Sequence, residues 1–393
     1  MRRALAWLGS RIAAALPDRL VRALLPGRYR YRESDVPPPP VPPDTAVRLY
    51  VGPVNWAGQG WQWARAAERN LSDVGAVTMA YRVGNEFGHP VDESVPVGAY
   101  LASGRWQRAQ HDAVVSGFSH VIVEAGRHPF GRIFDQSVVA QVRDLLVNGL
   151  AVAMVCHGSD IRLPSRHAAE NEYSPFHVGL LPSTPALERE ASRNRRLLDE
   201  LGLPVFVSTP DLLLDVPYAH WLPVVIDPAR WHTDSAPLER AIPIAVHAPS
   251  KEVPKGSDLI DPILSALHDE GIIDYRRLVG VPADRMPEEY RAADIVLDQF
   301  RVGDYGVAAV EAMAAGRVVV SHVSASARGH VLEASGLELP IVQATAGELE
   351  AVIRDIVARR EHFRARAAAG VWFAGEVHDG RRSAGVLKPF LTG

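Results

Sequence analysis

Runs of apolar residues alternate with stretches of helical periodicity twice along this chain of 393 residues. Strands are predicted at residues 46–51, 76–81, 120–124, 150–155 and 205–208, and again at 244–246, 275–281, 295–297, 318–320 and 340–343. Helices are predicted from residues 61 and 256, and over 135–147, 187–201, 286–293, 306–315 and 346–369. Strands that alternate with helices form βαβ units around a parallel sheet. The sequence therefore predicts an α/β protein with two doubly wound, Rossmann-like domains that face a cleft.

Clusters of proline mark the expected boundaries. Prolines gather at residues 37–43, where a polyproline stretch predicts a stiff linker, and the folded body is expected to begin at Asp44. A second cluster at residues 223–243 separates the two series. We therefore expect an arm and linker over 1–43, a first domain over 44–225 and a second over 226–371.

Composition excludes several classes of protein. Apolar residues make up 47% and charged residues 22% of the chain, which is the mixture of a globular protein and not of a disordered or collagen-like one. A formal net charge of −4 argues against a nucleic-acid partner. The single cysteine, Cys156, excludes an intrachain disulfide and a cysteine-rich zinc module, and it fits a reducing cytoplasm.

The first 32 residues are strongly basic, with eight arginines against one aspartate. Leu5, Leu8, Ile12 and Leu16 recur at helical spacing. A basic amphipathic helix can lie in a membrane surface with its arginines near anionic headgroups. This pattern predicts a cytoplasmic protein that is peripheral on the inner face of the membrane. The arm could instead pack on its own domain, bind a partner or be a poor signal peptide.

Two strand–helix junctions in the second series carry candidate binding residues. Residues 247–256 follow a strand and open a helix, and Lys255 there could hold a phosphate beside the helix amides. Residues 303–306 precede a second helix, in which Glu311 could accept hydrogen bonds from the hydroxyls of a ribose. The alternatives are an exposed lysine and a glutamate paired with an arginine.

The first series offers a glycine-rich turn and a histidine. The turn follows the first strand but lacks the spacing of a dinucleotide fingerprint; its candidate residues are Gly52, Asn55, Gly58 and Gly60. His157 ends the strongest strand and could hydrogen-bond a polar substrate, and Asp160 beside it is as consistent with capping the loop as with catalysis. The fifteen histidines lack ligand spacing, so no metal site is predicted.

Together these junctions resemble the GT-B glycosyltransferases, especially those of carbohydrate-active family 4. The resemblance is carried by residues 255–256, 293–299, 305–306 and 311–316, in that order. It implies retaining, metal-independent transfer of a sugar from a nucleoside-diphosphate sugar to an acceptor hydroxyl, without a cofactor. The basic arm suggests a glycan or lipid-linked acceptor, as in polysaccharide biosynthesis.

The resemblance also implies a role for individual residues. Lys255 would contact the donor diphosphate, the amides of Gly306 and Val307 would bind its phosphates, and Glu311 would bind ribose. His157 would contact the donor sugar, and the glycine-rich turn would flank phosphate and acceptor. The segment 372–393 would form a helix that crosses back to the first domain. Ser250 and Tyr305 are further donor-binding candidates, and the catalytic candidates are His157 and Asp304.

Two positions depart from the family pattern. The first glutamate of the family's glutamate pair falls at Gly303, where the adjacent Asp304 could substitute. The arginine that usually precedes the Lys-Gly pair is missing, and Ser250 or Lys251 stands in its region, with Arg301 as a further cation. The alternatives to a transferase are therefore a non-catalytic binding or scaffold subunit and another GT-B enzyme, such as a nucleotide-sugar epimerase.

Overall fold

The computed structural model describes residue 23 and residues 25–83, 88–133 and 137–393. The predicted amphipathic helix in the arm lies almost wholly outside these residues. The chain separates into two compact units: residues 1–156, 197–205 and 387–393 form the first, and residues 157–196 and 206–386 form the second. The predicted domain boundary at residues 225/226 stays a prediction, because compact units in the structure do not show which segments fold independently.

A seven-stranded sheet has the order β3-β2-β1-β4-β5-β6-β7. Its strands are β1 (Val47–Gly52), β2 (Val74–Arg82), β3 (Glu93–Pro96), β4 (His120–Glu124), β5 (Ala151–Cys156), β6 (Val205–Val207) and β7 (His220–Trp221). The paired strands run parallel, as the alternation with helices predicts. Leu49, Tyr50 and Val51 are buried on both faces of β1, which is why this strand reads as an unbroken apolar run.

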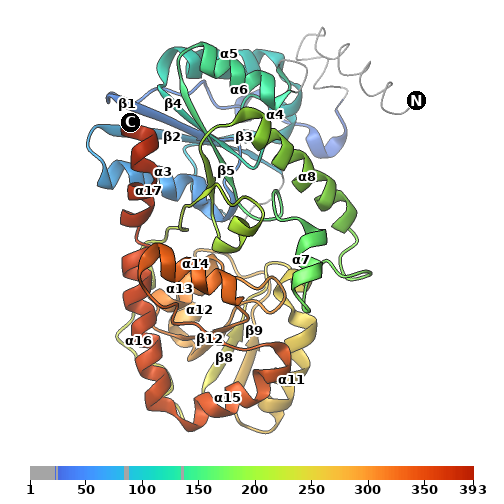
Figure 1. Cartoon of the computed structure of the whole chain (residues 1–393), viewed down its shortest axis with the longest axis vertical. Helices are drawn as coiled ribbons and strands as arrows, with labels where there is room; N and C mark the ends of the chain where they lie inside the picture. The colour runs from blue at the N-terminus through green and yellow to red at the C-terminus, as the bar shows by residue number, and fades with distance from the viewer. Residues whose placement is uncertain (1–22, 24, 84–87, 134–136) are drawn as a thin grey trace. The chain divides into compact units, whose positions relative to one another are not determined.

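Helices of the first unit follow its strands along the chain (Figure 1). They are η3 (Trp56–Gly58), α3 (Gln59–Asn70), α4 (Val97–Ala102), α5 (Gly104–Gly117) and α6 (Val138–Val147). Ser103 and Ser137 accept hydrogen bonds from the first-turn amides of α5 and α6, which fixes where those helices begin.

The proline-rich segment packs closely on the first unit. It follows two short 3-10 helices, η1 (Gly27–Tyr29) and η2 (Glu33–Asp35). A Cβ atom at Gly75 would lie 2.5 Å from Cβ of Pro43, and one at Gly117 would lie 2.9 Å from Cγ of Pro42. The segment predicted as a stiff linker therefore packs against Gly75 and Gly117, because only residues without a side chain allow so close an approach.

The second unit contains a five-stranded parallel sheet of order β12-β11-β10-β8-β9. Its strands are β8 (Ile244–His247), β9 (Asp274–Arg277), β10 (Ile295–Leu297), β11 (Val318–Ser321) and β12 (Val342–Gln343). Its helices are α7 (Pro164–Glu170), η5 (Pro210–Leu214), α9 (Pro228–Trp231), α10 (Glu252–Lys255), α11 (Ser257–Asp269), α12 (Met286–Ala292), α13 (Val307–Ala314), α14 (Ala325–Ser335), η6 (Ala346–Glu348), α15 (Leu349–Ala358) and α16 (Arg360–Val377). Two further helices, α8 (Thr184–Leu201) and α17 (Arg381–Thr392), have residues in both units.

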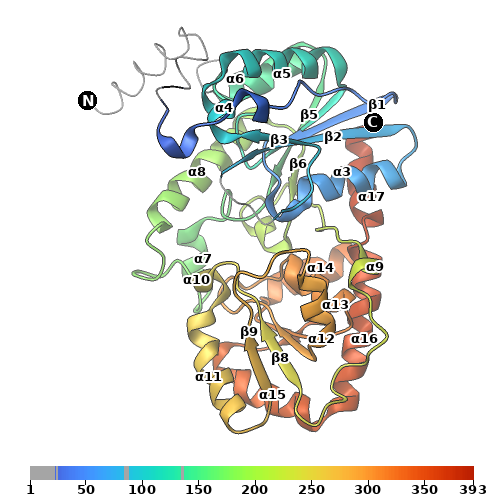
Figure 2. The ribbon, with the colours of Figure 1, turned by 180° about the vertical axis from the view of Figure 1, so that it is seen from behind.

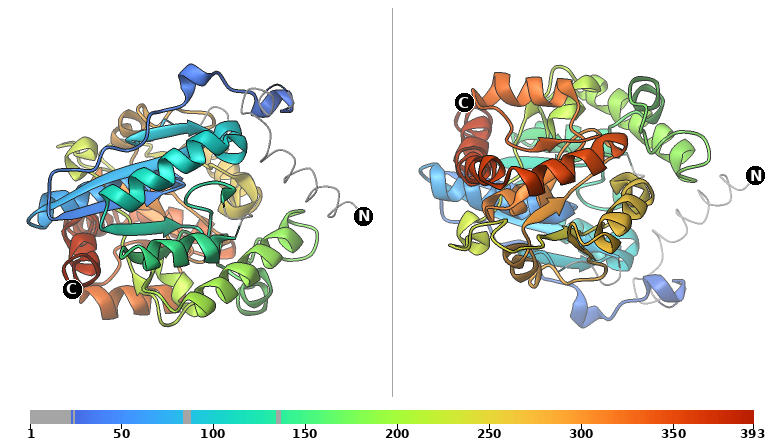
Figure 3. Two further views of the ribbon diagram at one scale, coloured as in Figure 1. Left: turned by 90° about the horizontal axis from the view of Figure 1, so that it is seen from above. Right: turned by 90° about the horizontal axis from the view of Figure 1, so that it is seen from below.

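Helices cover both faces of this second sheet (Figure 1, Figure 2 and Figure 3). Ile244, Val246 and Val296 point to a face covered by α9, α12, α13, α14 and the end of α16. Ala245 and Ile295 point to the other face, covered by α11, α15 and the start of α16. The alternation of buried residues along each strand thus supplies two apolar cores, as a doubly wound sheet requires.

The predicted C-terminal helix over 372–393 is wrong in its start and its continuity. Residues 360–377 form α16, residues 381–392 form α17, and Gly380 between them has a φ of +102°. Residues 387–393 belong to the first unit. In the part of the chain that the structure describes, no helix is long and apolar enough to cross a membrane.

Candidate functional site

Lys255 and Gly306 converge on one buried carboxylate at the carboxyl ends of β8 and β10. The ammonium of Lys255, whose side chain is 14% exposed, forms an ion pair with Oδ1 of Asp298, which has no exposed side-chain surface. The amide of Gly306 donates to Oδ2 of the same carboxylate at 3.2 Å. Asp298 directly follows β10, so a cation and a helix N-terminus are brought together at one anion.

Glu311 lies in the second turn of α13, the helix that Gly306 caps. Burial raises the pKa of this half-buried carboxyl to about 8, although the nearby cations Arg230 and Lys255 oppose the shift. Within the described ranges its carboxyl makes no hydrogen bond or ion pair. At neutral pH the group is therefore largely protonated and can both donate and accept.

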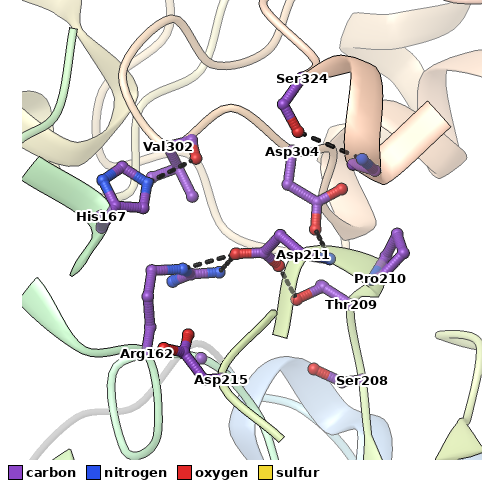
Figure 4. Close-up of polar contacts among 12 residues, drawn as sticks. Arg162, His167, Ser208, Thr209, Pro210, Asp211, Asp215, Val302, Asp304 and Ser324 are labelled. Atoms are coloured by element: carbon purple, nitrogen blue, oxygen red, sulfur yellow. Dashed lines mark hydrogen bonds and ion pairs between the residues drawn. The ribbon is translucent and has the colours of Figure 1, made fainter. Parts of the chain in front are cut away.

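A buried charge network holds the loop before α13 (Figure 4). Arg162 donates to Oδ2 of Asp211 from Nε and Nη2, each at 2.6 Å, and Thr209 donates to Oδ1 at 2.7 Å. Asp304 reaches the same aspartate from the opposite side, where its Oδ2 accepts from the Asp211 amide at 3.3 Å. The network thus ties η5 and the segment before α7 to the loop before α13.

The two aspartates of this network titrate in opposite directions. Burial and the adjacent Asp211 carboxylate raise the pKa of Asp304 far above its usual range, whereas Arg162 holds the pKa of Asp211 below its usual range. Asp304 is 1% exposed, and its Oδ1 accepts from the Tyr305 amide at 2.7 Å. It therefore sits as a neutral acid inside the protein, and its predicted catalytic role stays untested.

The backbone conformation at Gly303 favours glycine over glutamate. Its φ is +75°, a left-handed conformation that glycine adopts without strain and glutamate does not. A Cβ atom there would lie 3.1 Å from Nδ2 of Asn171. The Gly303 carbonyl accepts from the Ser324 amide at 2.8 Å, which fixes the loop in this conformation.

The remaining candidates of the second unit lie in different surroundings. Ser250 is exposed in the loop between β8 and α10. Tyr305 is 2% exposed, and its hydroxyl lies 3.3 Å from Nε2 of His378. Asp160 caps the loop after β5 by accepting from the amides of His157 at 3.1 Å and Gly158 at 2.7 Å, while His157 itself is half-buried. Val307 is half-buried at the first position of α13.

In the first unit, the glycine-rich turn is built around a residue that the sequence analysis missed. Glu124 is fully buried at the end of β4 and accepts from the Val54 amide at 3.1 Å. A Cβ atom at Gly60 would lie 2.9 Å from Oε1 of Glu124, so a side chain there would displace the Glu124 carboxylate. Asn55 closes the turn, since its Oδ1 accepts from the Trp61 amide at 3.1 Å. The sequence did offer a signal for Glu124, because this acid directly follows the apolar run 121–123 of β4.

The other missed residues are Arg162, Asp211 and Asp298. Asp298 carried a signal, because it ends the apolar run 295–297 inside the motif that supports the family resemblance. No local sequence pattern indicates the ion pair between Arg162 and Asp211, because it depends on the tertiary fold. In the described residues, no group of three or more His, Cys, Asp or Glu side chains could hold a metal ion.

Comparison with known proteins shows the fold. No protein-family model and no curated protein matches the sequence. Among solved structures, HepE from Anabaena in complex with UDP and glucose is similar over 88% of this chain and 98% of its own, with 13% identity and a TM-score of 0.53. Sucrose-phosphate synthase from Thermosynechococcus elongatus is similar over 87% and 97%, with 11% identity and a TM-score of 0.54.

WaaG, a glycosyltransferase involved in lipopolysaccharide biosynthesis, is similar over 88% of this chain and 100% of its own, with 14% identity and a TM-score of 0.52. At such low identities the likeness shows the fold and nothing finer. The predicted fold class is confirmed: the chain has the two Rossmann-like, parallel-sheet units of the GT-B fold.

Proposed function

We propose that the protein transfers a sugar from a nucleoside-diphosphate sugar to an acceptor hydroxyl. The observation that carries this proposal is the convergence of the Lys255 ammonium and the Gly306 amide on one anion beside the unpaired carboxyl of Glu311. Similar structures support it, because HepE has been crystallised with UDP and with UDP-glucose.

The leaving diphosphate is the group that this constellation would stabilise. An ammonium has three donors, and Asp298 uses one of those of Lys255, which leaves two for phosphate oxygens. The N-terminus of α13 adds a partial positive charge and the amide of Val307, beside the Gly306 amide that donates to Asp298. Donors fixed before the reaction stabilise developing charge at little reorganisation cost.

Glu311 would bind the ribose of the donor. Its carboxyl lies one turn inside the same helix, is half-buried, and has no partner within the described part of the chain. Two neighbouring hydroxyls can hydrogen-bond to the two oxygens of one carboxyl group, which in its protonated form both donates and accepts. Diphosphate and ribose contacts would therefore come from consecutive turns of one element.

The proposal also includes a retaining and metal-independent reaction, with His157 at the donor sugar. Asp304 enters it as a positioning residue, since its carboxyl holds the amide of Tyr305 directly before Gly306. Transfer should persist in the presence of EDTA, and product anomers resolved by NMR should retain the donor configuration. A polysaccharide or lipid-linked acceptor at the cytoplasmic membrane face remains part of the proposal.

The decisive experiment measures nucleotide binding and turnover separately. Calorimetric titration with UDP, GDP, ADP and dTDP should reveal one preferred nucleotide. Lys255→Ala should weaken its binding by about 2–5 kcal/mol, while Lys388→Ala, at an exposed lysine of α17, serves as the matched control. Unchanged affinity in Lys255→Ala would remove the diphosphate role.

A non-catalytic binding subunit is the second candidate, and the absent carboxylate at position 303 favours it. This candidate predicts nucleotide binding without hydrolysis or transfer when nucleotide sugars and glycan acceptors are supplied. Release of free nucleoside diphosphate upon addition of an acceptor would eliminate it.

A further inference from the structure

We propose that the second unit contains a saccharide-binding cavity separate from the proposed donor site. The cavity has a volume of about 320 Å³, within the range of about 300–1,000 Å³ that small-molecule sites occupy. The segment after α7, the loop before α13, and residues that follow β11 and β12 line it. Lys255, Gly306 and Glu311 are not among its lining residues.

Hydrogen bonds fix two polar side chains of the cavity lining, His167 and Asn171. Nε2 of His167 donates to the Val302 carbonyl at 2.8 Å (Figure 4). Its Nδ1 accepts from the Ser174 hydroxyl at 2.7 Å. Nδ2 of Asn171 donates to the Arg301 carbonyl at 2.9 Å, and its Oδ1 accepts from the Tyr173 amide at 2.9 Å. The cavity is therefore preformed, which lowers the entropic cost of binding.

The charges of the lining argue against an anionic ligand. Its arginine, Arg166, donates from Nε and Nη2 to the buried Asp215, both at 2.7 Å, and from Nη1 to Glu170 at 2.6 Å. Burial lowers the pKa of His167 to about 4, so this side chain is neutral at physiological pH. Glu172 adds an exposed carboxylate to the rim. A phosphate or uronate would meet acidic groups without a cation to pair with.

The groups that face a ligand are those that bind sugars. The half-buried Tyr173 contributes an aromatic ring, held edge-to-face against His322 at a centroid distance of 5.5 Å. In the described residues its hydroxyl has no hydrogen-bond partner. Hydroxyls of Ser324, Ser326 and Thr345 complete the lining. An aromatic face packs on the CH groups of a sugar ring while hydroxyls and carboxylates bind its edges.

If the protein is a glycosyltransferase as proposed above, the saccharide in this cavity would be the acceptor. This assignment rests on the proposed function. Gly303 lines the cavity and stands three residues before Gly306, which faces the donor diphosphate. One loop thus separates the saccharide from the donor site. The binding of a saccharide itself does not depend on that role.

The test measures saccharide binding to the full-length protein by saturation-transfer NMR. The probes are maltose, cellobiose, lactose and α-1,6-mannobiose, with glucuronic acid and inorganic phosphate as anionic counterparts. We expect transfer to at least one neutral disaccharide and none to the anions. Absence of transfer to all four disaccharides, or preferential binding of the anions, would overturn the proposal.

Variants locate the binding. Tyr173→Ala should weaken it about tenfold, and Glu172→Gln, at an exposed position where folding is not at stake, should weaken it several-fold. The matched controls Tyr218→Ala, with a tyrosine 51% exposed outside the lining, and Glu338→Gln, at another exposed glutamate, should leave it unchanged. If both Glu172→Gln and Tyr173→Ala bind the saccharide as tightly as the wild type does, the saccharide binds elsewhere and the cavity proposal is rejected.

Titration with the preferred nucleotide separates this inference from the proposed function. Lys255→Ala should weaken nucleotide binding and keep saccharide binding. Tyr173→Ala should weaken saccharide binding and keep nucleotide binding. If saccharide binds but no nucleotide does, the cavity stands and the transferase proposal fails. If nucleotide binds and no saccharide does, the cavity alone fails.

Discussion

At the scale of single residues, the ionisation of Glu311 has a consequence for stability. Burial raises its pKa in the folded protein to about 8, from an ordinary value of 4.5. Between these values the folded state binds a proton that the unfolded state lacks, so stability falls as pH rises. Glu311→Gln removes this dependence. The free energy of unfolding of the wild type should therefore fall relative to the variant by about 4 kcal/mol from pH 5 to pH 9.

Urea denaturation of both proteins at a series of pH values measures that difference. Glu338→Gln, at an exposed position, supplies the control for loss of a carboxylate. Parallel curves for wild type and Glu311→Gln would show that burial does not raise the pKa of Glu311 and that the group is ionised at neutral pH.

Asp304 gives a second prediction at this scale, because it is held as a neutral acid. Asn keeps an acceptor for the Tyr305 amide and a donor toward the Asp211 carboxylate, and it loses only the acceptor for the Asp211 amide. Ala leaves both buried amides without a partner. Asp304→Ala should cost about 2–4 kcal/mol of stability, and Asp304→Asn should cost less than half as much. Equal losses, measured by thermal unfolding at pH 7, would contradict a neutral Asp304.

At the scale of elements, uninterrupted apolar runs were predicted well. Both β4 (120–124) and β10 (295–297) have the predicted bounds, because central parallel strands are buried on both faces. The short edge strands β3 and β7 were missed, since their few residues show no alternation. The long helix predicted over 346–369 is divided between η6, α15 and α16, with Arg359 outside helical geometry at the junction.

The candidate site was predictable only where it follows a strand. Lys255 and Glu311 stand at strand–helix junctions, and local pattern found them. Asp211 meets Arg162 and Asp304 across 49 and 93 residues of sequence, so that network is fixed by packing that no local pattern records. For the same reason the sequence did not predict why glycine occupies position 303. Its left-handed backbone depends on contacts with Asn171 and Ser324, which are distant in sequence.

The loop before α13 provides the prediction for an element. Restoring the family's carboxylate by Gly303→Glu places a side chain at a φ of +75° and 3.1 Å from Asn171. Left-handed strain should destabilise the protein by about 1–2 kcal/mol, and Gly303→Ala should cost a similar amount. Thermal unfolding compares the two. A Gly303→Glu protein as stable as the wild type would mean that the loop accommodates a side chain at this position without strain.

At the scale of the whole molecule, the amino-terminal 43 residues divide into two parts with different expected effects. Residues 1–22 carry five arginines against one aspartate. Residues 27–43 include Pro42 and Pro43, which cover the backbone at Gly117 and Gly75. A deletion of residues 1–22 therefore removes charge, whereas a deletion of residues 1–43 also uncovers part of the first unit.

These two deletions test membrane association without confusing it with unfolding. Removal of residues 1–22 should leave the thermal midpoint unchanged and abolish sedimentation with vesicles that contain phosphatidylglycerol, because each arginine near an anionic surface contributes about 1 kcal/mol. Vesicles of phosphatidylcholine alone, and full-length protein at high salt, should give little sedimentation. Removal of residues 1–43 should also lower the midpoint. If the shorter deletion retains vesicle binding, the arm is not the membrane anchor, and the surface of the folded units would have to supply it.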